Sequence, residues 1–240
     1  MMIYVGLDDT DTLDDPGTNQ LARHLVRELS DKFVGQIIVR HQLLEDPRVP
    51  CTRKNGCASM LFEPRADGEP TRGIQQLIAA MRSIIIPWCP AGSDPGLCVT
   101  DRVPPAVIEW GQRCKRELVT QQEARQIAKE YGVYLEGLGG TQDGVIGALA
   151  AVGLLSTRND GRVVYLGSGG EDLYDITGRL SVESILARGI AEIYDVDSGT
   201  RVIGGVVEVG KRLRPNYREG RVVLYAARRA ESEWEAVRVT

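Results

Sequence analysis

Short apolar runs alternate with amphipathic segments along most of the chain. Residues 3–7 form an apolar run, which predicts a buried parallel strand. After a polar stretch, Leu21, Leu25, Val26 and Leu29 recur with the period of a helix, and Thr18 or Asn19 can cap its start. The same reasoning predicts strands over 37–44, 57–62, 96–100, 133–136 and 163–166, and helices over 71–85, 107–115 and 145–154.

Two further features complete the predicted architecture. Thr120 and Glu123 fit a capping box, so a helix is expected to run from there to Tyr131. The last part of the chain changes to strand-like runs over 202–209, 221–226 and 234–239. The pattern therefore predicts a mixed α/β (α+β) protein with a β-rich tail. Two modules are expected, over residues 1–118 with an Asp-rich loop and 119–240 with a Gly-rich loop and the tail, and they can interleave.

Composition narrows the class of protein. Hydrophobic residues make up 42% and charged residues 26% of 240 residues, which is typical of a globular chain. The net charge of −4 argues against nucleic-acid binding by overall charge, so RNA would require a local patch. Without a long apolar run or a signal-like N-terminus, a cytoplasmic protein with no membrane partner is expected. The five cysteines include no CxxC pair, which favours buried, reduced thiols over disulfides or a zinc site.

Clustered carboxylates directly after the first strand are the strongest chemical signal. Asp8, Asp9 and Asp11 stand there, and Asp14 and Asp15 follow closely. Carboxylates this close repel one another unless a cation lies among them, and hard oxygen ligands suit magnesium. The alternative is a solvated acidic turn. The sequence thus predicts a metal site at Asp8, Asp9 and Asp11, and phosphate binding through the metal.

Two known acidic motifs fit this segment less well. An EF-hand loop that starts at Asp9 would require Asp or Asn at Leu13 and Gly at Asp14. A haloacid-dehalogenase phosphatase would require Thr or Val where Leu13 stands. The EF-hand is excluded, and a phosphatase with Asp9 as nucleophile stays as an alternative.

A glycine-rich loop precedes the predicted helix over 145–154. Such a loop can bring backbone amides and a helix N-terminus to a phosphate. It has no Gly-Lys-Ser/Thr and is not a P-loop, and its glycines could instead permit tight packing, as could Gly147. The candidate cofactor-binding residues are Gly139, Gly140, Thr141, Asp143 and Gly144.

Basic segments offer weaker candidates. Arg53 and Lys54 precede Asn55-Gly56, which indicates a hairpin turn as readily as a phosphate contact. In the tail, a basic segment that contains Tyr217 could touch phosphate or RNA, although a solvated hairpin face is favoured. Its arginines are Arg212, Arg214, Arg218 and Arg221. His24 and His41 have no partner spacing, so structural or surface roles are expected for both.

Together these motifs resemble the archaeal tRNA-isoleucine 2-agmatinylcytidine synthetase family. That family has Gly-Ile-Asp-Asp-Thr-Asp-Ser where this chain has Gly-Leu-Asp-Asp-Thr-Asp-Thr. Its Cys-Thr-Thr-x-Leu-Ala, Pro-x-Lys-Thr-Arg-Gly-Asn-Gly-Ala, Asn-Pro-Gly and Gly-x-Ile-Gly-Ala-Leu-Ala-Ala-Ile-Gly elements have counterparts in the same order. The five segments of this chain are 6–12, 17–22, 51–58, 94–96 and 144–153.

The resemblance implies a kinase-like domain joined to a ferredoxin-like domain, with ATP and magnesium as cofactors. Members of the family phosphorylate a cytidine carbonyl of tRNA, and agmatine then displaces the phosphate. By position, Asp8, Asp9 and Asp11 would hold metal and triphosphate. Thr18 would match the threonine that becomes phosphorylated, and Arg53 would contact phosphate.

Departures from the family pattern weaken the inference that this chain shares the family's tRNA substrate. Cys51 replaces a family lysine, while Lys54 replaces a glycine and could reach the same phosphate. The OB-fold and zinc ribbon that bind tRNA in the family are not expected here, which argues against full tRNA recognition.

The favoured interpretation is an ATP- and magnesium-dependent phosphoryl-transfer or ligase-type enzyme. Its acceptor would be a nucleotide, RNA or small metabolite, and an amine is a further candidate substrate. The alternatives are a non-catalytic nucleotide- or RNA-binding module and a metal-dependent phosphatase. The sequence determines neither the acceptor nor the oligomeric state.

Overall fold

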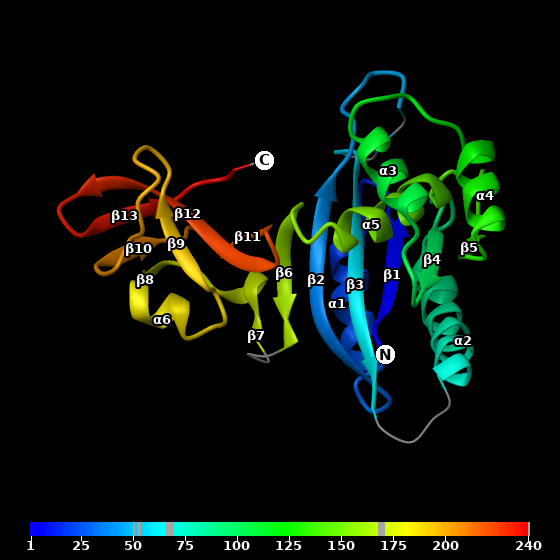
Figure 1. Cartoon of the computed structure of the whole chain (residues 1–240), viewed down its shortest axis with the longest axis horizontal. Helices are drawn as coiled ribbons and strands as arrows, with labels where there is room; N and C mark the ends of the chain where they lie inside the picture. Colours follow the sequence, from blue (N-terminus) through cyan, green and yellow to red (C-terminus); the bar gives the residue numbers. More distant parts are fainter. Residues whose placement is uncertain (50, 52–53, 66–69, 168–170, 240) are drawn as a thin grey trace.

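A computed structural model describes residues 1–49, 51, 54–65, 70–167 and 171–239 of the chain. Over these residues, thirteen strands form one continuous sheet that links a helix-covered part to a β-rich part (Figure 1). The strands run in the order β5 (Tyr134–Gly137), β4 (Gly96–Thr100), β1 (Ile3–Asp8), β3 (Gly56–Pro64), β2 (Phe33–Gln42), β6 (Arg162–Leu166), β11 (Asn216–Arg218), β12 (Arg221–Ala230), β13 (Glu233–Ala236), β10 (Val206–Glu208) and β8 (Arg179–Ser181). In addition, β7 (Glu171–Asp172) pairs with β6, and β9 (Glu192–Asp195) pairs with β12. The mixed α/β class is confirmed.

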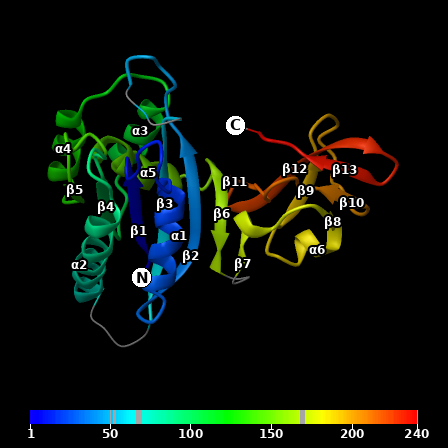
Figure 2. The same ribbon diagram turned by 180° about the vertical axis from the view of Figure 1, so that it is seen from behind.

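Helices cover both faces of the sheet in the first part. Helices α1 (Thr18–Glu28) and α2 (Pro70–Trp88) pack on one face, which is seen from the front in Figure 2. On the other face lie α3 (Pro105–Cys114), α4 (Gln121–Glu130) and α5 (Val145–Ser156). Because successive side chains of a strand point to opposite faces, both faces of β1 are buried.

The first strand is antiparallel to both neighbours, so the predicted parallel pairing was wrong. Gly6 is opposite Ser59 of β3 and Cys98 of β4. The continuous apolar run reflects helices on both faces, which an antiparallel strand can also have. Helix α5 comes so close that a Cβ atom on Gly6 would lie 1.9 Å from the carbonyl oxygen of Ala148.

The β-rich part has its own apolar cluster, which includes Val182 and Ile185 of the short helix α6 (Val182–Leu186). A 3-10 turn, η2 (Leu173–Asp175), leads into it from β7. The single strand predicted over 202–209 is divided. Val202 bonds to Ile193, and β10 begins only after Gly205, which has a φ of +103°. The turn at Gly205 therefore breaks the apolar pattern into two short pairings.

Helix starts show where local signals succeed and fail. The predicted capping box is confirmed, because Thr120 accepts from the amide of Glu123 and the Glu123 side chain bonds back to residue 120. The predicted cap of α1 by Thr18 or Asn19 was wrong, since Gly17 is the N-cap and no side chain caps it. Thr18 is already inside the helix, and its hydroxyl has other partners.

Segments from both sides of residue 118 pack together in one apolar cluster. Trp110 of α3 packs in one cluster with Ala124 of α4 and Leu149 of α5, and its indole N–H donates to the carbonyl of Ile146 at 3.1 Å. In the described ranges, no helix combines the length and apolar character that crossing a membrane would require.

Candidate functional site

An acidic loop begins at the end of β1 and is fixed by tight backbone contacts. Asp8 is the last residue of the strand, and Asp9 has a φ of +52°, which turns the chain sharply. The amide of Asp94 donates to the carbonyl of Asp9 at 3.1 Å, which joins this turn to the start of β4. The Asp8 carboxylate lies directly against α5, where a Cβ atom on Gly147 would be 1.9 Å from Oδ2. The loop is therefore held in a conformation that gathers acidic side chains.

The pKa values of the first two carboxyl groups show the electrostatic cost of this arrangement. Burial, reinforced by the charge of Asp9, raises the pKa of Asp8 to about 8. Burial also raises the pKa of Asp9 to about 6, with further contributions from Asp94, Asp11 and Asp143. A bound cation would favour the charged carboxylates and offset their mutual repulsion.

The donor set suits a cation that is shared with a ligand rather than enclosed by protein. Among the residues that the structure describes, no group of three or more His, Cys, Asp or Glu side chains is arranged to hold a metal ion, so Asp8, Asp9 and Asp11 do not form such a group here. Magnesium commonly takes one or two carboxylates, and substrate phosphates and water complete its coordination. Asp8, Asp9 and Asp11 fit this mode in chemistry, and their role as ligands stays a prediction.

The helix after the loop brings Thr18 to the acidic residues. Its hydroxyl donates to Asp11 Oδ1 at 3.4 Å and accepts from the Thr10 hydroxyl at 3.1 Å. Thr18 is 8% exposed, and Thr10 is fully buried. The two hydrogen bonds hold the Thr18 hydroxyl beside a carboxylate. Sequence spacing alone did not show this proximity.

A cavity of about 850 Å³ lies on one side of the acidic loop. Its polar wall includes Asp94, Asp143 and Glu117 besides the loop itself. Its apolar wall is formed by Leu43, Leu44, Val49, Leu118, Val119 and Ile146. A volume of this size, with an apolar wall and a few polar groups, is typical of a small-molecule site. We call it the acidic cavity.

A second cavity of about 660 Å³ lies on the other side of the loop, at the junction with the β-rich part. Thr18 and Tyr174 line it, and so do Asp8, Asp9 and Asp11, which the two cavities share. Its remaining charge is positive, from Arg40, Lys54, Arg162, Arg212, Arg214 and Arg238. We call it the arginine cavity.

The glycine-rich loop packs on the turn at Asp94. Gly140 has a φ of +54°, and the next amide, of Thr141, donates to the Asp94 carboxylate. A Cβ atom on Gly144 would lie 2.1 Å from the carbonyl oxygen of Asp94. Asp143 lines the acidic cavity. The glycines are required for this close packing, and cofactor binding by Gly139, Gly140, Thr141, Asp143 and Gly144 stays a prediction.

The basic segment before β3 is only partly described. Arg53 lies outside the described residues. Lys54 is exposed, lies 3.4 Å from Glu45 and lines the arginine cavity. The Asn55-Gly56 turn is not a two-residue hairpin, because residues 43–55 connect β2 to β3 and Asn55 bonds back to Leu43 and Leu44. Cys51 is exposed at the border of both cavities.

The basic tail segment divides into two groups. Arg212 and Arg214 line the arginine cavity, whereas Arg218 bonds to the carbonyl of Tyr217 and Arg221 pairs with Glu192 at 2.7 Å. Sequence reasoning missed Asp94, Arg40, Arg162 and Arg238. The two strand arginines gave no local signal, because only the pairing of β2 with β6 brings them together.

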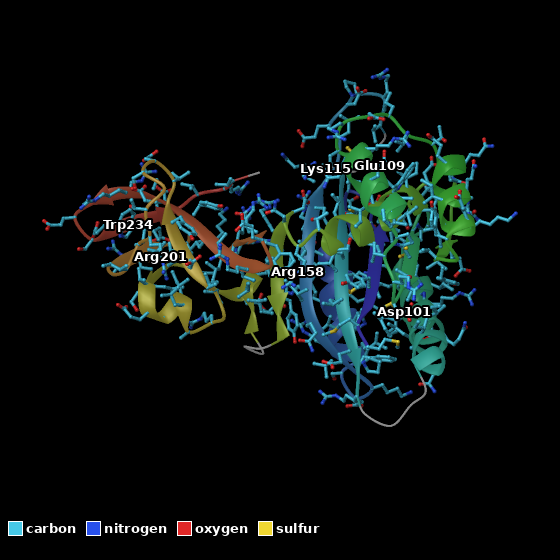
Figure 3. All side chains as sticks on the ribbon, in the orientation of Figure 1. Asp101, Glu109, Lys115, Arg158, Arg201 and Trp234 are labelled. Carbon is cyan, nitrogen blue, oxygen red and sulfur yellow. The ribbon has the colours of Figure 1, made fainter. Side chains whose placement is uncertain are left out.

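The two histidines have structural environments. His41 is fully buried and lies 2.7 Å from both Asp160 and Ser59. These three residue types occur in nucleophilic triads, but Ser59 is also fully buried and no substrate could reach it. Lys115, at the end of α3 and labelled in Figure 3, contacts the other oxygen of Asp160. His24 stacks on Trp88 with a centroid distance of 4.5 Å.

Comparisons with known proteins give one related group. The chain is 30% identical over 155 residues to TiaS of Pyrococcus horikoshii, a 2-agmatinylcytidine synthetase that acts on an isoleucine tRNA, and the match covers 64% of this chain and 36% of the relative. A solved tRNA fluorescent labelling enzyme aligns at 24% identity with a TM-score of 0.54, over 64% of this chain and 36% of that one. A complex of TiaS with its isoleucine tRNA and ATP aligns at 24% identity with a TM-score of 0.53, over the same shares. No family model matches the chain.

These matches show the fold and leave the activity open. At 24% sequence identity, the solved structures show that the chain shares their fold and nothing about its activity. The chain also spans only about a third of the length of the relatives it matches. The 155 matched residues are also too few to include both Arg40 and Arg238, which are 198 positions apart (238 − 40). The arginine cavity therefore uses residues beyond the matched segment.

Proposed function

This chain is related to the 2-agmatinylcytidine synthetases of isoleucine tRNA, and from that premise we propose that it is an ATP- and magnesium-dependent phosphoryl-transfer enzyme. The observation that carries the proposal is the position of Asp8, Asp9 and Asp11, which line two adjoining cavities beside the Thr18 hydroxyl. One cavity would take the nucleotide and the other the acceptor. The reacting groups would then meet at the acidic loop.

The acidic cavity suits the nucleotide for two reasons. Its apolar wall offers a surface for a base, and its polar wall contains the carboxylates to which a cation would attach a phosphate chain. Magnesium, when bound, would neutralise these carboxylates and the phosphate oxygens together. A crystal structure of TiaS in complex with tRNA and ATP shows that a related fold takes ATP, which supports nucleotide binding here.

Thr18 and Asp11 would form the transfer point. Asp11 accepts the hydrogen bond of the Thr18 hydroxyl, so it orients the oxygen and could take its proton. Thr18 would accept phosphate itself or border the acceptor. The first-turn amides of α1, which no side chain caps, would stabilise negative charge near this hydroxyl. Lys54 and Arg53 would offset charge that develops on the phosphate.

Isothermal titration of the chain with ATP and magnesium tests the proposal. Wild type should bind ATP with magnesium and lose most of that affinity in EDTA, since phosphate would attach through the cation. Asp8→Asn and Asp11→Asn should each weaken binding by about tenfold or more, because each removes a negative ligand from the ion. Asp101→Asn is the matched control, because this exposed aspartate, labelled in Figure 3, follows the far end of β4.

Equal heats for wild type, Asp8→Asn and Asp11→Asn would refute the metal-and-nucleotide site. Tight binding without turnover of ATP over a screen of acceptors would instead favour a non-catalytic binding module. Turnover is measured as ADP release with and without RNA, amines and phosphorylated metabolites. Release of phosphate from p-nitrophenyl phosphate that disappears in Asp9→Asn would favour the phosphatase alternative.

A further inference from the structure

The arginine cavity brings together arginines from four distant parts of the chain. Arg40 comes from β2 and Arg162 from β6, while Arg212 and Arg214 precede β11 and Arg238 follows β13. Arg40 and Arg162 are direct partners in the β2–β6 pairing. Like charges directly opposite each other in a sheet are destabilising. The fold therefore accepts a repulsive pair at the floor of this cavity.

Within the described part of the chain, none of these five arginines forms an ion pair with a carboxylate. Arg40 donates to the neutral side chain of Gln42 at 3.2 Å, and Arg212 lies over the ring of Tyr174 at 4.7 Å. Other arginines of the β-rich part do have acidic partners, as in Arg179–Glu233 at 2.7 Å. Among the described residues this is not unique to the cavity, since Arg218 and Arg228 also bond to backbone carbonyls. What distinguishes the cavity is that five such arginines line one site.

Electrostatic strain in the cluster points the same way. Burial, followed by the charge of Arg40, lowers the pKa of Arg162. Burial, followed by the charges of Arg238 and Arg212, lowers the pKa of Arg214. Guanidinium groups stay charged in proteins, so a bound anion would relieve this strain in addition to the carboxylates of Asp8, Asp9 and Asp11, which line the same cavity. Arginine suits phosphate in particular, because its planar fork can donate two hydrogen bonds to two oxygens.

We propose that the arginine cavity is a binding site for the phosphate group of a small phosphorylated acceptor substrate, separate from the site of the nucleotide. This inference rests on the proposed function in assigning the ligand as acceptor. The phosphate lies among Arg40, Arg162, Arg214 and Arg238, and the rest of the molecule extends towards Thr18 and the acidic loop, which line the same cavity.

The shape and charge of the molecule favour a small ligand over a nucleic acid. The cavity has about 660 Å³, which lies within the range of small-molecule sites. Nucleic-acid binding relies on an extended basic surface, whereas this chain has a net charge of −4. Three other arginines of the β-rich part, Arg179, Arg221 and Arg229, pair with glutamates. Five arginines and Lys54 gather in this one concave site.

Binding of ribose 5-phosphate, ribose and inorganic phosphate, measured by isothermal titration, tests the site. Ribose 5-phosphate and phosphate should bind wild type, and ribose should not. Arg214→Gln combined with Arg238→Gln should weaken phosphate-ligand binding by about tenfold or more, while the two Arg→Lys replacements should retain part of it. Affinity for ATP with magnesium should change less than about threefold in both double variants, the glutamine pair and the lysine pair.

The control, Arg179→Gln with Arg229→Gln, removes equal charge from surface ion pairs. It should change neither the affinity for ribose 5-phosphate nor the affinity for ATP.

Three results would overturn the inference. First, the variant with Arg214→Gln and Arg238→Gln could still bind ribose 5-phosphate and phosphate as wild type does, while its circular dichroism shows that it is folded. The same variant could lose ATP affinity in parallel, which would assign the arginines to the nucleotide. A hexanucleotide RNA without terminal phosphates could bind where ribose 5-phosphate does not. A different result would separate the two proposals. If wild type binds phosphate but not ATP, and only the cavity variants lose phosphate binding, the proposed function fails and the phosphate site stands.

Discussion

The Thr18 hydroxyl donates a hydrogen bond to Asp11 Oδ1 at 3.4 Å, although the two residues belong to different segments, a loop and the first turn of α1. The link depends on Gly17, which serves as N-cap without a side chain and leaves Thr18 free of a capping role. The second hydrogen bond, from Thr10, limits rotation of the hydroxyl. This geometry is the basis of the proposal that Thr18 receives or directs a phosphoryl group.

We predict that Thr18 becomes phosphorylated when the chain is incubated with ATP and magnesium. Thr18→Ser should retain the modification, and Thr18→Val should abolish it, because valine keeps the shape and removes the accepting oxygen. Mass spectrometry of proteolytic fragments would locate the phosphate. Thr157→Val is the control, since that hydroxyl donates to the carbonyl of Leu154 at the end of α5 and lines neither cavity. If wild type turns over ATP while Thr18 stays unmodified, Thr18 does not accept the phosphate and can only border the acceptor.

A second prediction concerns the stability cost of Asp8. Its folded-state pKa of about 8 lies above the value of 3.8 expected in the unfolded chain, so the fold binds this proton more tightly. Stability from this group is fully present below about pH 4 and is lost as pH rises towards 8. Asp8→Asn should therefore be more stable than wild type by roughly 1–3 kcal/mol at pH 7.5, with a difference that vanishes near pH 4.

Urea denaturation at pH 4 and 7.5 measures this difference, with Asp101→Asn as the control. The same Asp8→Asn variant should lose affinity for ATP with magnesium. A gain in stability together with a loss of binding would identify Asp8 as a residue retained for function. A less stable Asp8→Asn variant at pH 7.5 would contradict the prediction.

Local signals in the sequence identified most elements and drew attention to the acidic loop, which lines two cavities in the structure. The capping box at Thr120 and the strand at 96–100 depend on neighbouring residues, and both were predicted correctly. The parallel assignment of β1 failed because burial on both faces does not encode strand direction. The arginine cavity was missed because Arg40 and Arg238 meet only through sheet pairing and the return of the C-terminal strands. Long-range register of this kind leaves no local periodicity.

The buried His41 network should make stability fall in mild acid. Burial lowers the pKa of His41 below its usual 6.5, against the opposing effect of Asp160. The unfolded chain therefore binds a proton at higher pH than the fold, so stability from this group is present above pH 6.5 and is lost below it. The loss should approach about 1.4 kcal/mol per pH unit for one proton.

Chemical denaturation of wild type and His41→Gln between pH 5 and 7.5 checks this pH dependence. The variant should be less stable at pH 7.5, because Asp160 and Ser59 lose a buried partner, and its stability should change less with pH. His24→Gln is the control, since that ring stacks on Trp88 at a half-buried position. Parallel pH profiles for wild type and His41→Gln would contradict the assignment.

The last prediction uses two glycines that lie in helices and have opposite surroundings. In Gly147→Ala the new Cβ atom would lie 1.9 Å from Asp8 Oδ2, so either the carboxylate or α5 must move. We expect a loss of about 1–3 kcal/mol in the free energy of unfolding and at least about a tenfold loss of ATP affinity.

The matched control is Gly73→Ala, within α2. Its Cβ atom would lie 3.6 Å from the nearest heavy atom, which is ordinary van der Waals contact. Alanine should there stabilise the helix by about 0.5–1 kcal/mol and leave ATP binding unchanged. Thermal unfolding and titration of both variants measure the contrast. Equal ATP affinity in the two would mean that the position of Asp8 against α5 does not control the site.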